Sequence, residues 1–300
     1  MNNSIFLKDG TAQGVAKQRL IETLASPDKR VINDPYAERF VLGAGVLKLI
    51  GHKASVWLTR KFAPGFHEHL ISRTRFIDDL VEKETTNGTE QYVVLGAGYD
   101  MRAHRLNLPS TVNIFEIDQV EVQAKKRSKL PIELANSKNV TYVCVDFNHQ
   151  SLTEQLLAAG FDQNKSTVFT LEGVSQYITK DALNSTVQEL AQLTLNTTST
   201  FVLSYVDQRL EKEPKACFGR GYPNPVKKAE MIKNLSAKSG EPWVSFYTSE
   251  EIDGILSSNG FTLIENKSLA DLNTKYFSPV DRSLPEEQIF KLEHFVIAKT

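Results

Sequence analysis

The sequence predicts an α/β fold with a doubly wound, mostly parallel sheet of seven strands, a final antiparallel strand and an N-terminal helical cap. From about residue 91 onward, short β-rich runs alternate with amphipathic helical segments. The runs are apolar on both faces, as is typical of strands in a parallel sheet that helices cover on both sides. The last two runs are joined by a long connection without a clear helix-length apolar pattern, which favours a closing antiparallel hairpin.

Residues 1–90 have helical character and are expected to form a cap or extension. Apolar residues recur three and four positions apart in residues 14–25, 35–50 and 69–84, which is the spacing of one helix face. The polar segment TTNGTE, residues 85–90, then ends the helical pattern.

Seven strand-like runs follow and indicate one α/β domain over residues 91–300. They lie at residues 92–97, 112–118, 140–146, 166–173, 199–207, 261–269 and 293–299. Helical segments separate the early runs, at residues 119–130, 152–160 and 180–195. Residues 208–242 are charged and rich in Pro and Gly, which indicates an insertion over the end of the sheet. We expect the cap and the domain to form one compact unit.

Composition and charge limit the possible functions. The 300 residues carry a formal net charge of −1, so no global field recruits nucleic acid or an anionic membrane. The N-terminus lacks the features of a secretory signal, and no apolar run reaches the ~20 residues that span a bilayer. Cys144 lies in an apolar run and is expected in the core, while Cys217 lies in a loop-like region; their spacing indicates no disulfide framework. We expect a cytoplasmic protein without nucleic-acid or membrane partners, and the oligomeric state stays open.

Glycines and acids occur where successive strands of the predicted sheet end. Gly96 and Gly98 end the first strand and allow the backbone to approach a ligand closely. Asp118 ends the second strand, Asp146 the third, and Glu172 lies near the end of the fourth. Ligands of open α/β sheets bind beyond the carboxyl ends of the strands. The sequence therefore predicts a ligand site at these residues.

The same residues discriminate between two cofactors that contain adenosine. An acid twenty residues after Gly98 suits the ribose of either a nicotinamide dinucleotide or S-adenosylmethionine. The dinucleotide fingerprint needs a third glycine, and Met101 stands at that position. The carboxylates Asp118, Asp146 and Glu172 disfavour a diphosphate and suit a cationic sulfonium ligand, whereas a helix N-terminus alone would favour an anion. S-adenosylmethionine is the predicted cofactor, with a nicotinamide-dependent oxidoreductase as the remote alternative.

Four stretches, LGAGYDMRAHRL, FEIDQVEVQAKK, VDFN and LEGVSQYI, occur in this order from residue 95 onward. They resemble the LGAGxDTRxxRL signature and the successive acidic segments of the leucine carboxyl methyltransferase family, whose members use S-adenosylmethionine. NDPYAERF and RTRFIDD upstream also match, so the resemblance covers roughly residues 11–207. The departures are mild, because Met101 replaces a threonine and Val120 replaces a proline.

The resemblance implies nine cofactor-binding residues. Arg73 would pair with the carboxylate of the cofactor, Asp118 would hold the ribose, and Glu172 the methionine amino group. Asp146 and Phe147 would lie on the adenine side. The full set is Lys17, Arg73, Gly96, Ala97, Gly98, Asp118, Asp146, Phe147 and Glu172.

The basic residues in this set have structural alternatives. Arg19 competes with Lys17 for the basic, cofactor-facing position of the first helical segment. For Arg73, the alternative is an ion pair with Asp78 or Asp79 of the same helix.

The acids have structural alternatives as well. Asp118 would then only cap a strand end, and Asp146 would cap the helix that begins near Ser151. Glu172 would be a surface acid.

The acceptor side of the site is less defined. Methyl transfer from a sulfonium is an in-line displacement that demands alignment; a carboxylate acceptor is ionised at neutral pH, whereas a hydroxyl usually needs a general base. The HEH motif at residues 67–69 does not place both imidazoles on one helical face, so we expect no metal site. Tyr177 is the candidate catalytic residue, with a core tyrosine as the alternative. Arg220 and Tyr222 in the insertion are candidate substrate residues, with an ordinary mobile loop as the alternative.

The predicted function is an S-adenosylmethionine-dependent O-methyltransferase that acts on a carboxylate or hydroxyl oxygen of a small molecule. Two alternatives stay open besides the oxidoreductase. One is a methyltransferase for the C-terminal carboxyl group of a protein, and the other is a non-catalytic module that binds S-adenosylmethionine.

Overall fold

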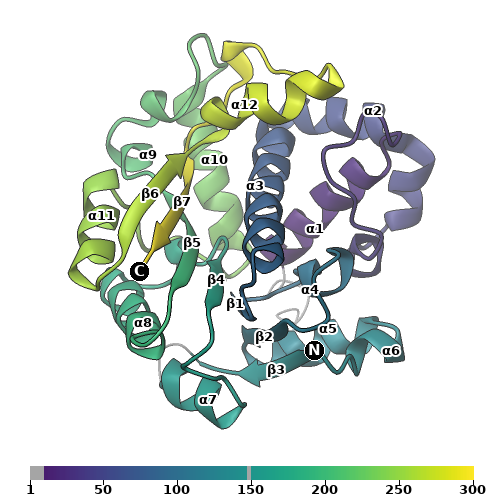
Figure 1. Cartoon of the computed structure of the whole chain (residues 1–300). Helices are drawn as coiled ribbons and strands as arrows, with labels where there is room; N and C mark the ends of the chain where they lie inside the picture. The colour runs from purple at the N-terminus through teal and green to yellow at the C-terminus, as the bar shows by residue number, and fades with distance from the viewer. Residues whose placement is uncertain (1–9, 147–149) are drawn as a thin grey trace, which may run out of the picture. The chain divides into compact units, whose positions relative to one another are not determined.

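The computed structural model describes residues 10–146 and 150–300 of the chain. Seven strands form one sheet in the order β3-β2-β1-β4-β5-β7-β6 (Figure 1). Their bounds are β1 (Gln91–Leu95), β2 (Asn113–Asp118), β3 (Val140–Cys144), β4 (Thr167–Leu171), β5 (Ser199–Val206), β6 (Thr262–Lys267) and β7 (Glu293–Lys299). This order reverses between β1 and β4, as in doubly wound sheets, and it confirms the predicted fold class.

The strand directions follow the prediction. β1 pairs in parallel with β2 and β4, β2 with β3, and β4 with β5. The final strand β7 runs antiparallel to β5. The amide of Thr300 donates to the carbonyl of Ser199 at the start of β5, at 3.1 Å, and the amide of Asp207 donates to the carbonyl of Leu292 just before β7, at 2.8 Å.

Helices of two groups accompany the sheet. Six helices in connections between strands are α4 (Arg102–Arg105), α5 (Val120–Lys129), α6 (Ile132–Ala135), α7 (Leu152–Ala158), α8 (Lys180–Leu193) and α11 (Ser249–Ser258), and all six lie within residues 77–205 and 247–266. The other helices are α1 (Gly10–Thr23), α2 (Ala44–Phe62), α3 (Phe66–Thr86), α9 (Arg209–Lys212), α10 (Pro225–Lys238) and α12 (Leu269–Phe277). Short 3-10 turns are η1 (Ala37–Phe40), η2 (Ser175–Tyr177), η3 (Pro214–Cys217), η4 (Ser278–Val280) and η5 (Glu286–Gln288).

The chain divides into two compact units. One unit contains Met1–Phe76, Val206–Phe246 and Lys267–His294, and the other contains Ile77–Tyr205, Tyr247–Asn266 and Phe295–Thr300. The first boundary between these units lies within α3. The expected insertion at residues 208–242 groups with the N-terminal helices, because its packing partners come from them.

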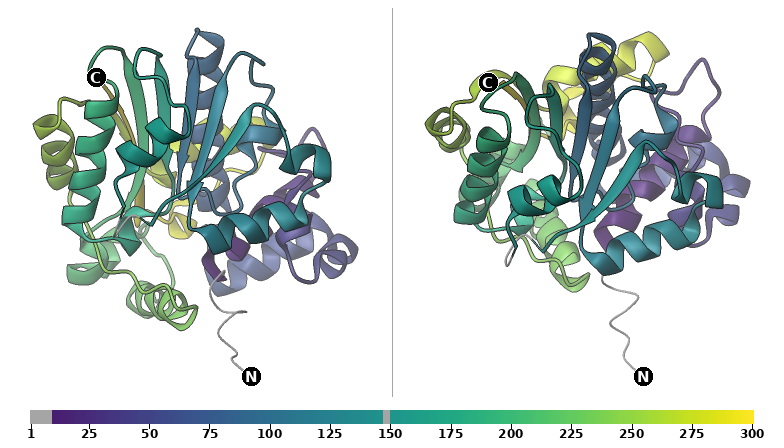
Figure 2. Two further views of the ribbon diagram at one scale, coloured as in Figure 1. Left: turned by 90° about the horizontal axis from the view of Figure 1, so that it is seen from below. Right: turned by 60° about the horizontal axis from the view of Figure 1, so that its bottom comes forward.

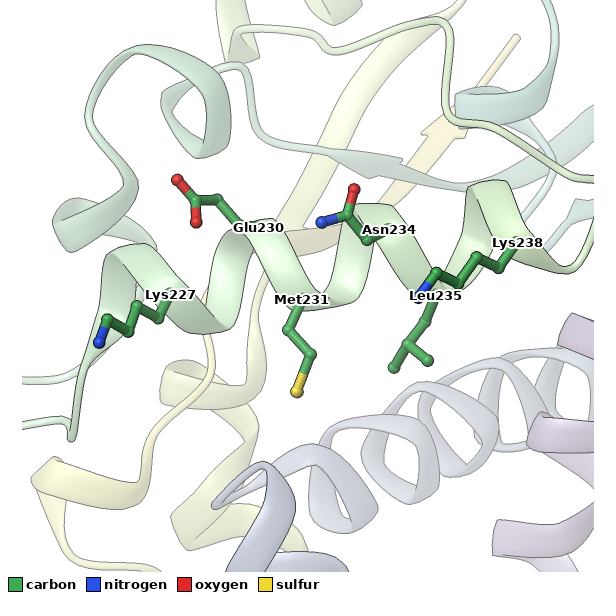
Figure 3. A pocket seen from close by; sticks show the side chains of 6 residues that line it. All are labelled: Lys227, Glu230, Met231, Asn234, Leu235 and Lys238. Carbon is green, nitrogen blue, oxygen red and sulfur yellow. The ribbon is translucent and has the colours of Figure 1, made fainter.

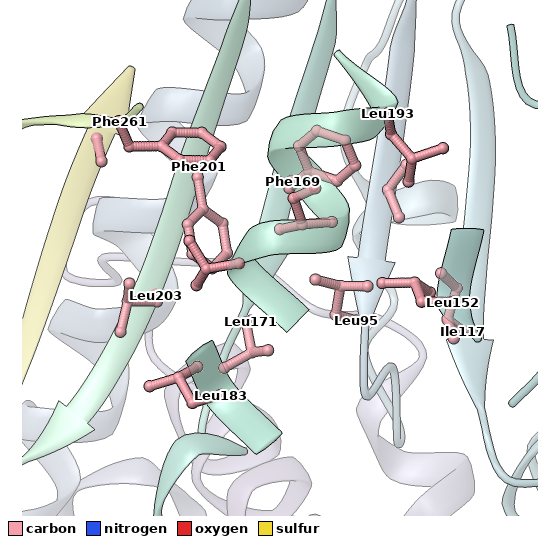
Figure 4. Close-up of a cluster of buried hydrophobic side chains, with 14 of the residues drawn as sticks. Leu95, Ile117, Leu152, Phe169, Leu171, Leu183, Leu193, Phe201, Leu203 and Phe261 are labelled. Carbon is pink, nitrogen blue, oxygen red and sulfur yellow. The ribbon is translucent and has the colours of Figure 1, made fainter. Parts of the chain in front are cut away.

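The second unit has its hydrophobic core between the sheet and the helices α8 and α11. On α8, Leu183, Val187 and Leu190 are fully buried at helical spacing. These side chains pack with strand residues such as Phe201, whose ring lies 5.9 Å from that of Phe261 (Figure 4). In Figure 2, α8 and α11 lie side by side against the strands.

Two local expectations were wrong. Cys144 is exposed, although it ends an apolar run, because the last residue of β3 turns its side chain away from the core. The connection between β6 and β7 contains the helix α12, which begins with a capping box of Ser268 and Asp271. Its apolar residues Leu269, Leu272 and Tyr276 are buried, so the helical spacing was present but short.

No helix in the described parts of the chain combines the length and the apolarity that crossing a bilayer requires.

Candidate cofactor site at the strand ends

The turn after β1 depends on glycine. Gly96 and Gly98 have positive φ angles, +68° and +46°, a region that favours glycine. A Cβ atom on Gly96 would lie 2.5 Å from Cγ2 of Val174, closer than real Cβ contacts. Both the positive φ angle and the packing of Val174 therefore require glycine at position 96.

Asp118, at the end of β2, reaches this glycine turn. Its Oδ2 accepts a hydrogen bond from the amide of Gly98 at 2.6 Å, and its Oδ1 accepts one from the amide of Gln119 at 2.7 Å. Burial raises the pKa of the Asp118 carboxyl, while these two hydrogen bonds act in the opposite direction. The structure therefore brings the predicted acid and the predicted glycine turn together.

Met101 occupies the position at which the dinucleotide fingerprint has its third glycine. Its side chain is fully buried, and the helix that follows, α4, has only the four residues Arg102–Arg105. A dinucleotide rests its pyrophosphate on the start of a longer helix that packs closely on the strand. A single helical turn that follows a buried methionine does not fit that role. The acids at the strand ends do not depend on this helix.

Glu172, directly after β4, lies beside a buried arginine. Nη1 of Arg102 donates to Oε2 of Glu172 at 2.6 Å, and the side chain of Arg102 is 2% exposed. The same guanidinium also pairs with Asp100 and with Asp78, the latter at 2.7 Å from Nε. Burial lowers the pKa of Arg102, but the three acids around it raise the pKa well above its usual value, so Arg102 stays charged.

Asp78 therefore pairs with Arg102, a partner that the sequence did not predict. Besides Arg102, it binds both terminal nitrogens of Arg105, at 2.6 and 2.7 Å. Arg102 and Arg105 are the two arginines of the quoted LGAGYDMRAHRL stretch, so the signal was present. The sequence did not reveal their partners.

A second buried ion pair lies behind the turn. Nζ of Lys126 is 2.6 Å from Oε2 of Glu116, and both side chains are 1% exposed. Lys126 also donates to the carbonyl oxygen of Asp100. Burial, with the positive charge of Lys126, lowers the pKa of His104 to about 4, so this imidazole is neutral at physiological pH.

The end of β3 supplies the third predicted acid. Asp146 follows β3 by two residues, and its amide donates to Oε1 of Gln150 at 2.9 Å. The helix α7 is capped by Ser151, whose Oγ accepts from the amide of Glu154. Asp146 is therefore not the residue that caps α7. Phe147 lies outside the described residues.

Tyr177 lies on the short turn η2, just after β4. The turn is fixed to β5, because the amide of Gly173 donates to Oγ of Ser204 at 2.8 Å, and Oγ of Ser175 donates to the carbonyl of Ser204 at 2.7 Å. Tyr177 is half-buried on this fixed segment. It lies five residues after Glu172 in the segment that leaves β4, and it stays a candidate for the acceptor side.

The predicted basic residues belong to the first unit. Lys17 is exposed on α1, whereas Arg19 is buried and donates to Oδ2 of Asp34 at 2.8 Å. Arg73 is buried and pairs with both carboxylate oxygens of Glu293, at 2.8 and 2.9 Å.

The two substrate candidates in the insertion have different surroundings. Arg220 is exposed, and Tyr222 is buried. The hydroxyl of Tyr222 donates to the carbonyl of Pro64 at 2.9 Å, and its ring lies 4.4 Å from that of Phe218. These contacts indicate a packing role for Tyr222.

The histidines of the HEH motif have separate partners. Nε2 of His69 lies 2.7 Å from Glu293, while Nε2 of His67 lies 2.9 Å from Oε2 of Glu22. His52 joins the second group, with its Nε2 3.5 Å from the same oxygen, so three potential metal ligands come together that the sequence did not predict.

A positive charge already occupies the carboxylate of this group. Both oxygens of Glu22 accept hydrogen bonds from Arg282, at 2.7 and 2.9 Å, and the amide of Val31 donates at 2.6 Å. Burial alone would raise the pKa of Glu22, but hydrogen bonds from His52, His67 and Arg282 lower it far below its usual range. The guanidinium group of Arg282 thus takes the place that a metal cation would need beside the carboxylate of Glu22.

Two surface hollows are lined only by residues of the first unit. One, of about 330 Å³, lies along α10 and is lined by Lys227, Glu230, Met231, Asn234, Leu235 and Lys238; Met231 and Leu235 point to the same side of the helix (Figure 3). The other, of about 380 Å³, is lined by Trp57, Arg60, Lys61, Pro64, Pro223, Glu287 and Gln288.

Comparison with known proteins identifies the class to which this fold and site belong. The sequence model of the leucine carboxyl methyltransferase family matches residues 12–191. A Rhodococcus jostii protein, named as a candidate S-adenosyl-L-methionine-dependent methyltransferase, is 31% identical over 93% of this chain and 90% of its own length. YktD of Bacillus subtilis, named in the same way, is 32% identical over 69% of this chain and 66% of its own length.

Solved structures agree at the level of the fold. A protein of family DUF574 from Streptomyces avermitilis has a TM-score of 0.58 at 12% identity, over 95% of this chain and 97% of that one. A candidate methyltransferase from Thermobifida fusca has a TM-score of 0.54 at 16% identity, over 94% of each chain. The chain belongs to the leucine carboxyl methyltransferase family. It is an S-adenosylmethionine-dependent methyltransferase, and S-adenosylmethionine is its methyl donor.

Proposed function

We propose that the protein transfers the methyl group to an oxygen atom, a carboxylate or a hydroxyl, of a small-molecule acceptor. The observation that carries this proposal is the match to a carboxyl methyltransferase family over residues 12–191. A carboxylate oxygen is ionised at neutral pH and needs no general base. The family name thus agrees with the least demanding chemistry for this site.

The proposal assigns the cofactor to the strand ends. Gly96, Ala97 and Gly98 would flank its methionine part, Asp118 would hold the ribose hydroxyls, and Glu172 would face the amino group. One observation supports this fit: the amide of Gly98 donates to Asp118, which brings the glycine turn and the acid together. S-adenosylmethionine supplies the electrophilic methyl group, and the protein has to hold donor and acceptor in line.

The remaining residues position these groups. Arg102 neutralises and orients Glu172 through its 2.6 Å contact. Tyr177 is placed on the acceptor side, on the fixed turn after β4. Both cysteines are free thiols, which supports a reducing, cytoplasmic location.

The test is to incubate the full-length protein with methyl-labelled S-adenosylmethionine and a metabolite extract. We expect label in small molecules, and base treatment separates the two acceptor classes because methyl esters release volatile methanol whereas methyl ethers do not. Label confined to the macromolecular fraction would instead favour the protein carboxyl alternative. Cofactor binding without any release of S-adenosylhomocysteine, over several extracts, would favour the non-catalytic module.

A further inference from the structure

Exposed apolar side chains are concentrated on α2 and the loop before it. Of the fifteen large apolar side chains that are exposed among the described residues, seven lie between residues 42 and 62. Leu42 and Leu49 are 88% and 89% exposed. We name this set the α2 apolar surface; its members are Leu42, Val46, Leu49, Ile50, Trp57, Leu58 and Phe62. Clusters of this kind on a helix mark an interaction site.

Only two of the nineteen residues of α2 are buried. Ser55 and Val56 are buried, and α2 packs against α1 within the first unit (Figure 1). Gly51 interrupts the helix with φ +77° and ψ 172°, so α2 consists of two helical segments joined at a kink. The α2 apolar surface extends over both segments.

The charge of α2 has a single sign. Its nineteen residues, Ala44–Phe62, contain Lys48, Lys53, Arg60 and Lys61 and no acidic residue. The whole chain has a net charge of −1. Lys48 pairs with Glu38 and Arg60 pairs with Glu68, so Lys53 and Lys61 are the cations that carry the local positive charge of α2. Lys61 lies over the ring of Trp57, 5.1 Å from its centroid, so a cation and an aromatic ring meet at one point of the surface.

Exposed apolar side chains together with positive charge indicate what kind of partner binds the α2 apolar surface. Helices that lie flat in a bilayer interface expose tryptophan, phenylalanine and leucine, flanked by lysine and arginine, which contact anionic lipid headgroups. A second copy of the chain that packed through the same face would bring like charges together, and lysine is depleted in protein–protein interfaces. The composition therefore favours a lipid surface over a second copy.

We propose that the α2 apolar surface binds an anionic lipid bilayer. The apolar side chains enter the boundary between headgroups and acyl chains, and the lysines contact the lipid phosphates. The proposal is independent of the acceptor of the methyl group. It replaces the expectation, drawn from the net charge, that no membrane is a partner.

The first test measures co-sedimentation of the full-length protein with vesicles. We expect binding to mixed phosphatidylcholine and phosphatidylglycerol vesicles and much weaker binding to phosphatidylcholine alone, with a loss of binding at high salt. The chain has two tryptophans, so the Trp243→Phe variant reports on Trp57 alone. Its emission should shift to shorter wavelength on the anionic vesicles, because the indole leaves water.

Two pairs of substitutions separate the apolar and the charged contributions. Leu42→Ser with Leu49→Ser should weaken binding at least tenfold, because two nearly fully exposed side chains would no longer enter the bilayer. Lys53→Gln with Lys61→Gln should weaken it about twenty-fivefold, which corresponds to about fivefold for each lysine near an anionic surface. The controls remove the same groups elsewhere: Leu195→Ser, and Lys138→Gln with Lys215→Gln, should bind like the wild type.

Absence of binding to the anionic vesicles would overturn the proposal. So would equal binding by the Leu42→Ser, Leu49→Ser variant when circular dichroism shows that it is folded. A dimer in light scattering that this variant dissociates, together with no vesicle binding, would assign the surface to a second copy and would likewise overturn the proposal.

Discussion

The carboxylate of Asp118 contacts the glycine turn and is also the group that we assign to the ribose. It accepts hydrogen bonds from the amides of Gly98 and Gln119, which fixes the glycine turn. An ionised carboxylate has about four lone-pair directions, so two hydrogen bonds leave capacity for ribose hydroxyls. The assignment of the ribose to Asp118 depends on this remaining hydrogen-bonding capacity.

Replacement of Asp118 tests the assignment. Asp118→Ala should weaken S-adenosylhomocysteine binding by about ten- to a hundredfold, because a hydrogen bond to a charged group contributes about 1.5–3 kcal/mol. Calorimetric titration measures the change, and Asp253→Asn, an exposed acid on α11, is the matched control. Unchanged affinity in a folded Asp118→Ala protein would mean that the pocket is assigned incorrectly.

Arg102 illustrates what a sequence motif conceals. Its partners Asp78, Asp100 and Glu172 lie 24, 2 and 70 positions away along the chain. The charge pattern predicts that arginines and acids are present, but several pairings satisfy it. Burial at 2% exposure makes one arrangement obligatory, because an unpaired charge there is costly.

Among the structural elements, the turn between β1 and α4 is tightly constrained. Gly96→Ala should destabilise the protein by more than about 1 kcal/mol, since the new Cβ requires both a positive φ and the space of Val174. Urea unfolding measures the effect, and it should be accompanied by weaker cofactor binding.

Gly254→Ala is the matched control for this turn. Gly254 lies inside α11, and no atom of a neighbouring side chain lies within 4 Å of the position that an alanine methyl would take. Alanine should therefore stabilise the helix by up to about 1 kcal/mol. If both variants had the same stability, the steric account of the turn would have to be abandoned.

The contact of α1 with α3 gives a pH-dependent stability. Hydrogen bonds hold the pKa of Glu22 below its usual value of 4.5. A group with a lowered pKa in the folded state stabilises the protein above its unfolded pKa, and this stabilisation is lost as the pH falls through the folded value. The contribution of Glu22 is therefore complete near neutral pH and declines below about pH 4.5.

Glu22→Gln should remove this dependence. The variant should be about 3–5 kcal/mol less stable near neutral pH, because Arg282 loses its buried partner. The difference in the free energy of unfolding between the variant and the wild type should shrink below about pH 4.5. Urea unfolding at neutral and at acidic pH measures this difference. The exposed Glu133→Gln serves as control. A gap that stayed constant with pH would show that the titration of Glu22 does not contribute.

For the whole molecule, cofactor selection should be visible as thermal stabilisation. A ligand at one hundred times its Kd stabilises the folded state by about 2.7 kcal/mol, which raises the Tm by several degrees in a chain of this size. S-adenosylhomocysteine should produce this shift and NADH should not. The opposite result would restore the oxidoreductase alternative, and it would contradict the reasoning from Met101 and the one-turn helix α4.

The domain organisation could be predicted only in part from the sequence. The helical character of residues 14–84 and the strand runs after residue 91 were visible as local periodicity. The grouping of residues 206–246 and 267–294 with the N-terminal helices was not. It depends on contacts between segments that are far apart along the chain, such as the hydrogen bond from Tyr222 to Pro64.

The sequence by itself determined the class of sheet, the glycine turn, the acids at successive strand ends and the family. These features follow from side-chain spacing and from the identity of residues at strand ends, which are local properties. Only the tertiary structure decided which charges pair, as with Arg102 and Glu172. It also decided which apolar residues stay outside: the periodicity predicted a helix but did not reveal that Leu42 and Leu49 are 88% and 89% exposed. Burial is a property of the packed chain, and neighbours in sequence do not determine it.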